Sequence, residues 1–346
     1  MKALFLAGGM GTRLKPLTDS IPKPMIPIMT KPILEQNILK LKTCGVDEII
    51  LSTCYKSENI EEYFGDGNKW GVKITYVIEE TPLGTGGAIK NTEQYFNETF
   101  LVFNADIFCD IDINEMINFH KEKKAMVTIA VTEVGNPTAF GVIEYNENLY
   151  ATSFTEKPEL SQIKSNYINA GIYLFEPEAL QLIPAANVVS VERETFPLIL
   201  EKGHQIGVFK SDAYWMDVGT IKKYIQVQQD ILKGICPLPE YLNSTQHVYV
   251  GKNPGIHPTV QIISPVYIGE DVTIGENSII GPNTIIGNGC QVSAGQTISD
   301  TIIWDNINIQ EDSIFLNIIY GSSSLIYENL NKNKSKPDMT DISAAK

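Results

Sequence analysis

A strict six-residue repeat occupies the C-terminal part of the chain. Aliphatic residues stand at every sixth position, and glycine or a small or β-branched residue recurs at fixed offsets from them. The aliphatic row comprises Val250, Ile256, Ile262, Ile268, Ile274, Ile280, Ile286, Val292 and Ile298. This period is typical of a parallel β-helix, in which each hexapeptide forms one face of a three-sided coil and stacked coils share a buried aliphatic row. We therefore predict a β-helix over residues 250–325.

The residues before the repeat follow a different pattern. Up to about residue 235, short apolar runs alternate with segments in which apolar residues have helical spacing. The expected strands are residues 2–7, 47–53, 72–79 and 99–106, and the expected helices are residues 30–45, 58–64, 88–96 and 113–124. Such alternation predicts a mixed, mostly parallel α/β sheet of the Rossmann-like type, with helices on both faces. Ligands of such sheets bind beyond the carboxyl ends of the strands, so we expect function in the segments that follow strands.

These patterns divide the chain into parts. A chain of 346 residues is long enough for two domains, because single hydrophobic cores seldom grow past roughly 250 residues. We predict an α/β domain over residues 1–235, a linker over 236–249, the β-helix after it, and a disordered tail over 326–346, where apolar residues are few. Thr30 is expected to cap the first helix, with Pro32 in its first turn.

Charge and cysteine content argue against several classes of protein. The net charge of −14 opposes non-specific binding to nucleic acid or to an anionic membrane surface. An anionic substrate would therefore need a local cluster of basic residues. The five cysteines lie far apart and form no CxxC pair, which indicates neither a zinc knuckle nor a disulfide framework and favours the reducing cytoplasm. No apolar run approaches the ~18 residues of a membrane span.

The segment LAGGMGTRLKPLT directly follows the first expected strand and combines glycines with basic side chains. Gly8, Gly9 and Gly11 allow backbone N–H groups to approach an anion, and Arg13 offers a planar fork for phosphate oxygens. Lys23 lies between two prolines, in a segment that we expect to be non-helical. A tight turn remains the alternative interpretation of the glycines alone, since the segment matches neither the Walker A loop nor the dinucleotide fingerprint.

With these residues the chain resembles the sugar-nucleotide pyrophosphorylases, which are nucleotidyltransferases that join a sugar 1-phosphate to a nucleoside triphosphate (NTP). After LAGGMGTRLKPLT and PKPM, further pieces follow in the family's order: EETPLGTGGAI at 79–89, NADIF at 104–108, FGVI at 140–143, EKP at 156–158, NAGIY at 169–173 and YWMDVGT at 214–220. A hexapeptide domain is also a family trait, and the resemblance implies that its coils are left-handed. The segments EETPLGTGG, ETFPLILEKG and YWMDVGT resemble the mannose-1-phosphate guanylyltransferase branch most closely.

The resemblance implies a reaction that needs no general base. An oxygen of the sugar phosphate attacks the α-phosphorus of the NTP, and pyrophosphate leaves. A phosphate monoester, with its second pKa at about 6, is largely a dianion at neutral pH. In the family, the positions of Asp106 and Asp217 hold Mg²⁺, for which carboxylate oxygens are suitable ligands. By the same resemblance Arg13 and Lys23 brace the triphosphate. The local sequence of Asp106 also fits a turn or a helix cap.

The resemblance also assigns residues to the two substrates. The nucleotide is expected at Leu6, Ala7, Gly8, Gly9, Gly11, Thr12, Arg13, Lys23, Glu79, Glu80, Pro82 and Gly84. The sugar phosphate is expected at Gly141, Glu156, Lys157 and Asn169. Guanine presents N1–H and N2–H₂ donors that a carboxylate accepts as a pair, whereas a glutamine would suit thymine or uracil. We therefore favour GTP and hypothesise that either Glu79 or Glu80 contacts the base.

Other interpretations stay open. A glucose-1-phosphate thymidylyl- or uridylyltransferase is the nearest alternative. A non-catalytic subunit that senses sugar nucleotides is less favoured, because the four residues expected to carry the chemistry are all present. An acyltransferase, another common owner of hexapeptide β-helices, would need a protruding loop with a histidine, and residues 262–300 contain neither. Open coil ends expose strand edges and apolar rows, which predicts a homo-oligomer through the β-helix or the catalytic domain.

Overall fold

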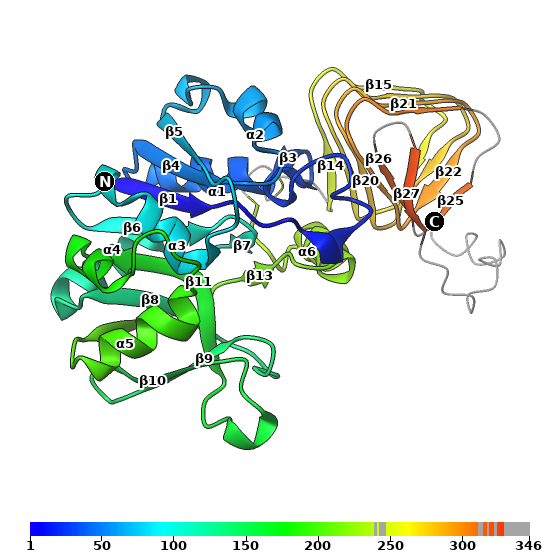
Figure 1. Ribbon diagram of the computed structural model, residues 1–346. Helices are drawn as coiled ribbons and strands as arrows, with labels where there is room; N and C mark the ends of the chain where they lie inside the picture. The colour runs from blue at the N-terminus through cyan, green and yellow to red at the C-terminus, as the bar shows by residue number, and fades with distance from the viewer. Residues whose placement is uncertain (239–240, 242–246, 311–313, 317, 322–323, 329–346) are drawn as a thin grey trace. The chain divides into compact units, whose positions relative to one another are not determined.

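The computed structural model describes residues 1–238, 241, 247–310, 314–316, 318–321 and 324–328. The chain divides into two compact units, which are described separately (Figure 1). The first unit comprises Met1–Ile231 with Ile235–Pro237, and the second comprises Leu232–Gly234 with Leu238–Lys346. Among the described residues, no helix combines the length and the apolar character needed to cross a bilayer.

A nine-stranded mixed sheet forms the centre of the first unit. Its strands are β1 (Lys2–Leu6), β4 (Glu48–Thr53), β5 (Lys73–Ile78), β6 (Phe100–Asn104), β8 (Val127–Glu133), β9 (Gly141–Tyr145), β10 (Ala151–Glu156), β11 (Tyr167–Phe175) and β12 (Ile206–Lys210). The main path runs β10-β9-β11-β6-β1-β4-β5, and β8 pairs with both β11 and β12. Strands β6, β1, β4 and β5 are parallel, whereas β11 runs antiparallel to β6, β8 and β9. The predicted mixed α/β sheet is confirmed.

Helices cover both faces of this sheet, as predicted (Figure 1). They are α1 (Ile33–Thr43), α2 (Ser57–Phe64), α3 (Gly84–Asn91), α4 (Ile113–Lys123) and α5 (Phe196–Glu201). A further helix, α6 (Ile221–Leu232), ends this part of the sequence. Alternate residues of β1 point to opposite faces, so that Ala3 and Phe5 pack in one core and Leu4 in the other. The first core takes apolar residues of α1, α2 and α4, and the second takes those of α3 and α5. Burial on both faces explains the nearly continuous apolar runs of the central strands.

Two local expectations are wrong. Thr30 does not cap α1, because the chain first forms the short strand β3 (Lys31–Pro32) against β2 (Pro27–Ile28), and Pro32 then takes the N-cap position. The segment around Lys23 is helical after all: Lys23–Met25 forms a single 3₁₀ turn with Pro24 inside it. Proline is tolerated there because the first turn of a helix has no partner for its backbone N–H groups.

The second unit is a stack of parallel strands on three faces. One face holds β14 (Val248–Val250), β17 (Val266–Ile268), β20 (Thr284–Ile286), β23 (Ile302–Ile303) and β26 (Ile318–Gly321), with β27 (Ser324–Glu328) antiparallel to β26. A second face holds β15 (Gly255–Ile256), β18 (Thr273–Ile274), β21 (Gln291–Val292) and β24 (Asn308–Ile309). The third holds β16 (Gln261–Ile262), β19 (Ile279–Ile280), β22 (Thr297–Ser299) and β25 (Ile314–Leu316). The buried core contains the predicted aliphatic row from Ile268 to Ile298, which confirms the hexapeptide β-helix.

The stack of coils continues beyond Ile298, the last residue of the six-residue aliphatic row. Strand pairing joins Val266 to Thr284, but it joins Ile285 to Ile302, so one residue is lost from the following coil. That deletion moves the last coil out of the strict six-residue period, although the predicted range 250–325 includes it. Strand β14 begins inside the predicted linker 236–249, and β27 overlaps the first residues of the predicted tail 326–346. Residues 329–346 lie outside those described.

Candidate active site

A cavity of about 420 Å³ opens where β1 and β6 end. These two strands are parallel and in register, so the residues that follow them meet at one edge of the sheet, where Ala105 N donates to Leu6 O at 3.2 Å. Every residue predicted to bind the nucleotide lines this cavity except Glu80: Leu6, Ala7, Gly8, Gly9, Gly11, Thr12, Arg13, Lys23, Glu79, Pro82 and Gly84. The wall also includes Pro24, Thr85, Ala88, Asn104, Ala105, Asp106 and Gly219.

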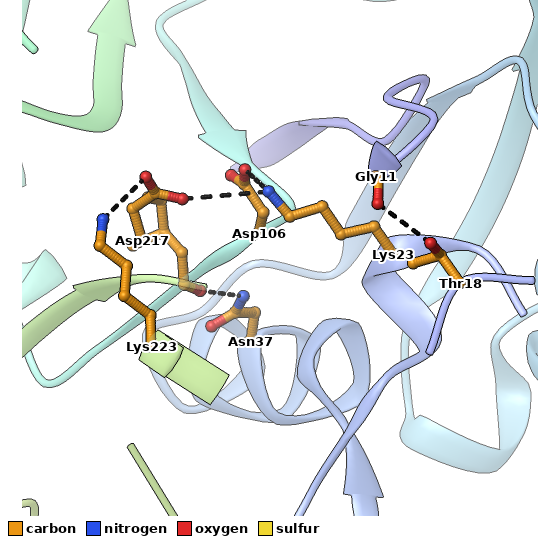
Figure 2. A network of polar contacts seen from close by, with 8 residues as sticks. Gly11, Thr18, Lys23, Asn37, Asp106, Asp217 and Lys223 are labelled. Atoms are coloured by element: carbon orange, nitrogen blue, oxygen red, sulfur yellow. Dashed lines mark hydrogen bonds and ion pairs between the residues drawn. The ribbon is translucent and has the colours of Figure 1, made fainter. Parts of the chain in front are cut away.

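The glycine loop is shaped by a residue that has to be glycine. Gly11 has a φ of +62°, and a Cβ there would lie 2.9 Å from Thr18 Cγ2 and 3.1 Å from Lys23 Cβ. The Thr18 hydroxyl donates to Gly11 O at 3.0 Å, which fixes the loop against the segment that carries Lys23 (Figure 2). The loop and the lysine are therefore packed together as one structure.

Of the two adjacent glutamates, only Glu79 faces the first cavity. Its carboxylate is buried and accepts hydrogen bonds from Ser52 Oγ at 2.7 Å and from Leu83 N at 2.9 Å. Burial, reinforced by the Glu79 carboxylate, raises the pKa of the Cys54 thiol beside it. Glu80 is exposed and does not line the cavity. The prediction that Glu80 binds the nucleotide therefore finds no support in its position.

A second cavity, of about 290 Å³, adjoins the first and shares Arg13, Asn104 and Asp106 with it. All the residues predicted to bind the sugar phosphate line it, namely Gly141, Glu156, Lys157 and Asn169. Asp217 lines it too, together with Ile107, Ala139, Phe140, Gly171, Glu192, Trp215 and Lys223. The residues predicted to bind the sugar phosphate therefore line one cavity, and those predicted to bind the nucleotide, apart from Glu80, line the adjoining one.

The polar groups of the second cavity are partly held by one another. Lys157 Nζ lies 3.3 Å from Glu156 Oε1 and is more than half exposed. Asn169 Nδ2 donates to the Tyr173 hydroxyl at 2.7 Å, and Asn169 Oδ1 accepts from Gly171 N at 2.8 Å. Burial, together with the nearby Glu192 carboxylate, holds the pKa of Tyr173 well above its ordinary value, so the hydroxyl stays neutral.

Asp106 and Asp217, far apart in the sequence, meet at the junction of the cavities (Figure 2). Strand β13 (Trp215–Asp217) pairs with β7 (Ile107–Cys109), and Val218 N donates to Asp106 O at 3.0 Å. Lys23 Nζ contacts Asp106 Oδ2 directly and lies 3.9 Å from Asp217 Oδ1. On the other side, Lys223 Nζ donates to Asp217 Oδ2 at 3.2 Å. One ammonium group therefore bridges both carboxylates.

The acid pair fits a divalent cation. Asp217 Oδ1 is buried and has no hydrogen-bond partner in the described part of the chain, and its ion pair with Lys23 is 3.9 Å long, beyond hydrogen-bond distance. A buried carboxylate oxygen without a hydrogen bond is costly, and a bound cation would offset that cost. Lys23 shows that a positive charge can sit between the carboxylates. The described residues contain no group of three acidic, histidine or cysteine side chains that could hold a metal. A cation here would complete its coordination with phosphate oxygens and water, as Mg²⁺ commonly does in nucleotide sites.

Several lining residues were not predicted as site residues. Trp215 stands two positions before Asp217 in β13, and since alternate residues of a strand share a face, this spacing could have revealed it. Lys223 lies in the first turn of α6 with its ammonium 5.0 Å from the centre of the Phe140 ring. Thr85 and Glu192 also line the cavities, and no motif points to their chemistry.

A glycine loop, two basic side chains and an acid pair at the carboxyl edge of an α/β sheet define a class of enzymes that bind and transfer phosphorylated nucleotides. The nucleotidyl transferase family matches residues 2–234, and the chain belongs to this family. It is an enzyme of the nucleotidyltransferase type, and the family uses a divalent metal ion. A second family, described as the GMPPB C-terminal domain, matches residues 262–333.

Individual relatives agree with this assignment. A mannose-1-phosphate guanylyltransferase of Mycobacterium tuberculosis is 37% identical over 89% of this chain and 81% of the relative. A UTP--glucose-1-phosphate uridylyltransferase of Synechocystis is 32% identical over 88% of this chain and 83% of the relative. Among solved structures, HddC from Yersinia pseudotuberculosis, also solved in complex with GMP-PN, is 31% identical with a TM-score of 0.57, covering 66% of this chain and 98% of that one. The predicted family resemblance is confirmed.

Proposed function

We propose that the chain transfers a guanylyl group from GTP to mannose 1-phosphate, giving GDP-mannose and pyrophosphate. The observation that carries this proposal is the junction of the two cavities, because the walls expected for the NTP and for the sugar phosphate share Arg13 and Asp106. An NTP in the first cavity and a sugar phosphate in the second would bring their reacting phosphates to this junction. Such alignment of two anions is the main requirement of phosphoryl and nucleotidyl transfer.

In the proposed reaction an oxygen of the sugar phosphate forms a bond to the α-phosphorus. The bond from this phosphorus to the oxygen that bridges to the β-phosphate breaks, and the electron pair leaves with pyrophosphate. Arg13 and Lys23 would neutralise the charge that builds on the leaving group, since both line the first cavity beside the glycine loop. Asp106 and Asp217 would hold Mg²⁺, which when bound neutralises phosphate charge at the junction. No side chain has to accept a proton.

Preference for guanine is supported by Glu79. Its buried carboxylate faces the first cavity, and each carboxylate oxygen retains a lone pair beyond the bonds from Ser52 and Leu83. These lone pairs suit the N1–H and N2–H₂ donors of guanine. The GMP-PN complex of HddC adds support, because this structural relative binds a ligand named as a guanine nucleotide.

Preference for mannose is supported by the relatives. Several that span most of the chain are named as mannose-1-phosphate guanylyltransferases, including the catalytic subunit beta of Xenopus tropicalis at 36% identity. The Synechocystis uridylyltransferase, at 32% identity over a similar span, keeps a glucose 1-phosphate and UTP pair as the second candidate. Both candidates use the same chemistry at the junction.

A substrate matrix tests this proposal. Pyrophosphate release is measured for GTP, ATP, UTP and dTTP, each with mannose, glucose and galactose 1-phosphates and Mg²⁺. We expect the largest kcat/KM for GTP with mannose 1-phosphate. A larger value for any other pair would reject the proposed specificity, and no release with any pair would reject the proposed reaction. Asp106→Asn and Asp217→Asn should abolish release while circular dichroism stays unchanged, and Asp110→Asn, at an exposed aspartate four residues from Asp106, serves as the matched control.

We also propose that the protein forms a homo-oligomer in a reducing compartment such as the cytoplasm. Val250, in the first coil, is 37% exposed, whereas Ile268 and Ile286 of the following coils are fully buried, so the first coil presents apolar surface. The five cysteines are all free thiols, as is usual in reducing compartments. Light scattering at micromolar concentration that gives the mass of one chain would reject the oligomer.

A further inference from the structure

Glu192 occupies an unusual local structure on the wall of the second cavity. It lies in a π-helix, Val191–Thr195, whose N-cap residue Ser190 accepts a hydrogen bond from Arg193 N at 3.2 Å. Glu194 reaches back to accept from Ser190 N at 2.8 Å, which closes the turn. Single π turns occur often at functional sites, because the extra residue redirects a side chain. The turn holds the half-buried Glu192 side chain at the cavity wall.

Within the part of the chain that the structure describes, hydrogen bonds reach one oxygen of Glu192. Oε2 accepts from Thr85 Oγ1 at 2.6 Å and from Ser190 Oγ at 2.8 Å. Oε1 accepts no hydrogen bond from the residues that the structure describes, and no basic side chain among them forms an ion pair with this carboxylate. By contrast, Glu156 on the same wall is paired with Lys157 at 3.3 Å. A half-buried carboxylate with neither a counter-ion nor a partner for one oxygen is poised to accept from a ligand.

Thr85 fixes this arrangement from the nucleotide side. It lies in α3, lines the first cavity, and its hydroxyl both donates to Glu192 and accepts from Val191 N at 3.0 Å. The start of α3 is tied to the same segment, because Gly86 N donates to Val189 O at 2.8 Å and Val189 N donates to Leu83 O at 2.9 Å. The hydroxyl of Thr85 therefore has two defined partners on the π-helix, and a side chain of the same shape without oxygen would lose both.

The surroundings of Glu192 match those of a sugar ring. Tyr173, whose hydroxyl holds Asn169, lies close enough for the Glu192 charge to act on it. Phe140 and Trp215 provide an aromatic pair in the same cavity, with ring centres 5.7 Å apart. Sugar rings combine apolar C–H faces, which pack on aromatic rings, with hydroxyl donors, which bind carboxylates. Oε1 has room for a hydrogen-bond donor from a ligand, and the hydroxyls of a sugar 1-phosphate supply several.

We propose that Glu192 accepts a hydrogen bond from a hydroxyl of the sugar 1-phosphate, and that Thr85 is the positioning residue that holds it for this contact. This inference rests on the proposed function, in which the second cavity takes the sugar. Glu192 contributes to recognition of the sugar ring and Thr85 acts only through Glu192. The glutamate therefore affects the choice of sugar and leaves the choice of base to the first cavity.

The test uses the full-length enzyme and the sugar 1-phosphate that gives the highest kcat/KM in the matrix, together with its 2-, 3-, 4- and 6-deoxy analogues. Glu192→Gln should raise the KM for the sugar 1-phosphate about tenfold or more, as expected on losing a charge-assisted hydrogen bond, while the KM for the NTP changes less than twofold. One deoxy analogue should be turned over equally well by wild type and Glu192→Gln, which identifies the hydroxyl. Glu194→Gln, which removes a charge from the same turn but keeps an acceptor for Ser190 N, is the control.

Thr85 supplies the second arm of the test. Thr85→Val should raise the KM for the sugar 1-phosphate in wild type and have no further effect in Glu192→Gln, and Thr85→Ser should restore the wild-type value. If Glu192→Gln does not fold, this Val and Ser pair decides the matter. Equal sugar KM values for wild type and Glu192→Gln would overturn the inference, as would a loss that is the same for every deoxy analogue. Absence of turnover by wild type with every pair would instead reject the proposed function itself.

Discussion

Replacing Gly11 by alanine tests whether stability and activity depend on the particular backbone conformation of the glycine loop. The backbone at Gly11 has a φ of +62°, which costs a residue with a Cβ about 1–2 kcal/mol. The new methyl group would also lie 2.9 Å from Thr18 Cγ2 and 3.1 Å from Lys23 Cβ. Neither neighbour is the free end of a flexible chain, so relief of these contacts moves the segment around Lys23, at a cost of about 1–3 kcal/mol. Together the two effects amount to about 3 kcal/mol of unfolding free energy.

Thermal unfolding and pyrophosphate release measure the two consequences. A loss of about 3 kcal/mol lowers the Tm of a domain of this size by about 6–12 °C. Displacement of Lys23 by a fraction of an ångström moves its ammonium away from Asp106 and from the proposed triphosphate site, so kcat/KM should fall about 10-fold or more. Gly9→Ala is the matched control for stability, because no atom lies within 4 Å of the position that a Cβ at residue 9 would take. Equal Tm values for the two variants would refute the reasoning.

Further predictions concern the pH dependence, the β-helix and the metal. Burial lowers the pKa of His120 below its usual 6.5, against the opposing effect of Glu176, so the folded protein resists a proton that the unfolded chain accepts. The free energy of unfolding should therefore fall as the pH drops from about 6.5 towards the lowered pKa, and His120→Gln should flatten that fall in urea titrations from pH 8 to pH 5. Ile286→Ala removes a fully buried side chain of the β-helix and should cost about 2–5 kcal/mol; a loss within 0.5 kcal/mol, about the effect of a surface substitution, would show that the row is not a packed core. Chelation with EDTA should abolish pyrophosphate release and added Mg²⁺ should restore it, whereas release that persists in EDTA would contradict the role of Asp106 and Asp217.

The architecture could be predicted from the sequence wherever a local period specifies the structure. The β-helix follows from its six-residue repeat because each hexapeptide repeats the same side-chain environment. The aliphatic row of strict period six stops at Ile298, because one deleted residue breaks the period while leaving the strand pairing intact. The sequence did not predict that β11 lies antiparallel between β6 and β8. Strand order depends on pairing between distant segments, and the residue pattern within one segment does not specify its partner.

The residues that line the first cavity were easier to predict from the sequence than those that line the second. The glycine loop, Arg13 and Lys23 come from one stretch near the N-terminus, where glycines and basic residues stand close in sequence and where the family resemblance assigns them together. The second cavity collects Gly141, Lys157, Glu192 and Trp215 from separate elements, so its composition depends on how those elements pack. Thr85 and Glu192 illustrate the difficulty. They lie far apart in the sequence, and no sequence motif indicates that their side chains form a hydrogen bond.

The acid pair shows why such a site needs the whole α/β unit. Asp106 follows β6, and its position is fixed from below by α1, where the buried Asn37 side chain donates to Ile107 O at 2.8 Å (Figure 2). Asp217 is the last residue of β13, which pairs with β7 and lies outside the main sheet. Two carboxylates held this closely repel each other unless a cation lies between them, and Lys23 provides that cation from the glycine-loop segment. The loop, the sheet edge and β13 therefore depend on one another electrostatically, because the positive charge of Lys23 holds the two carboxylates together.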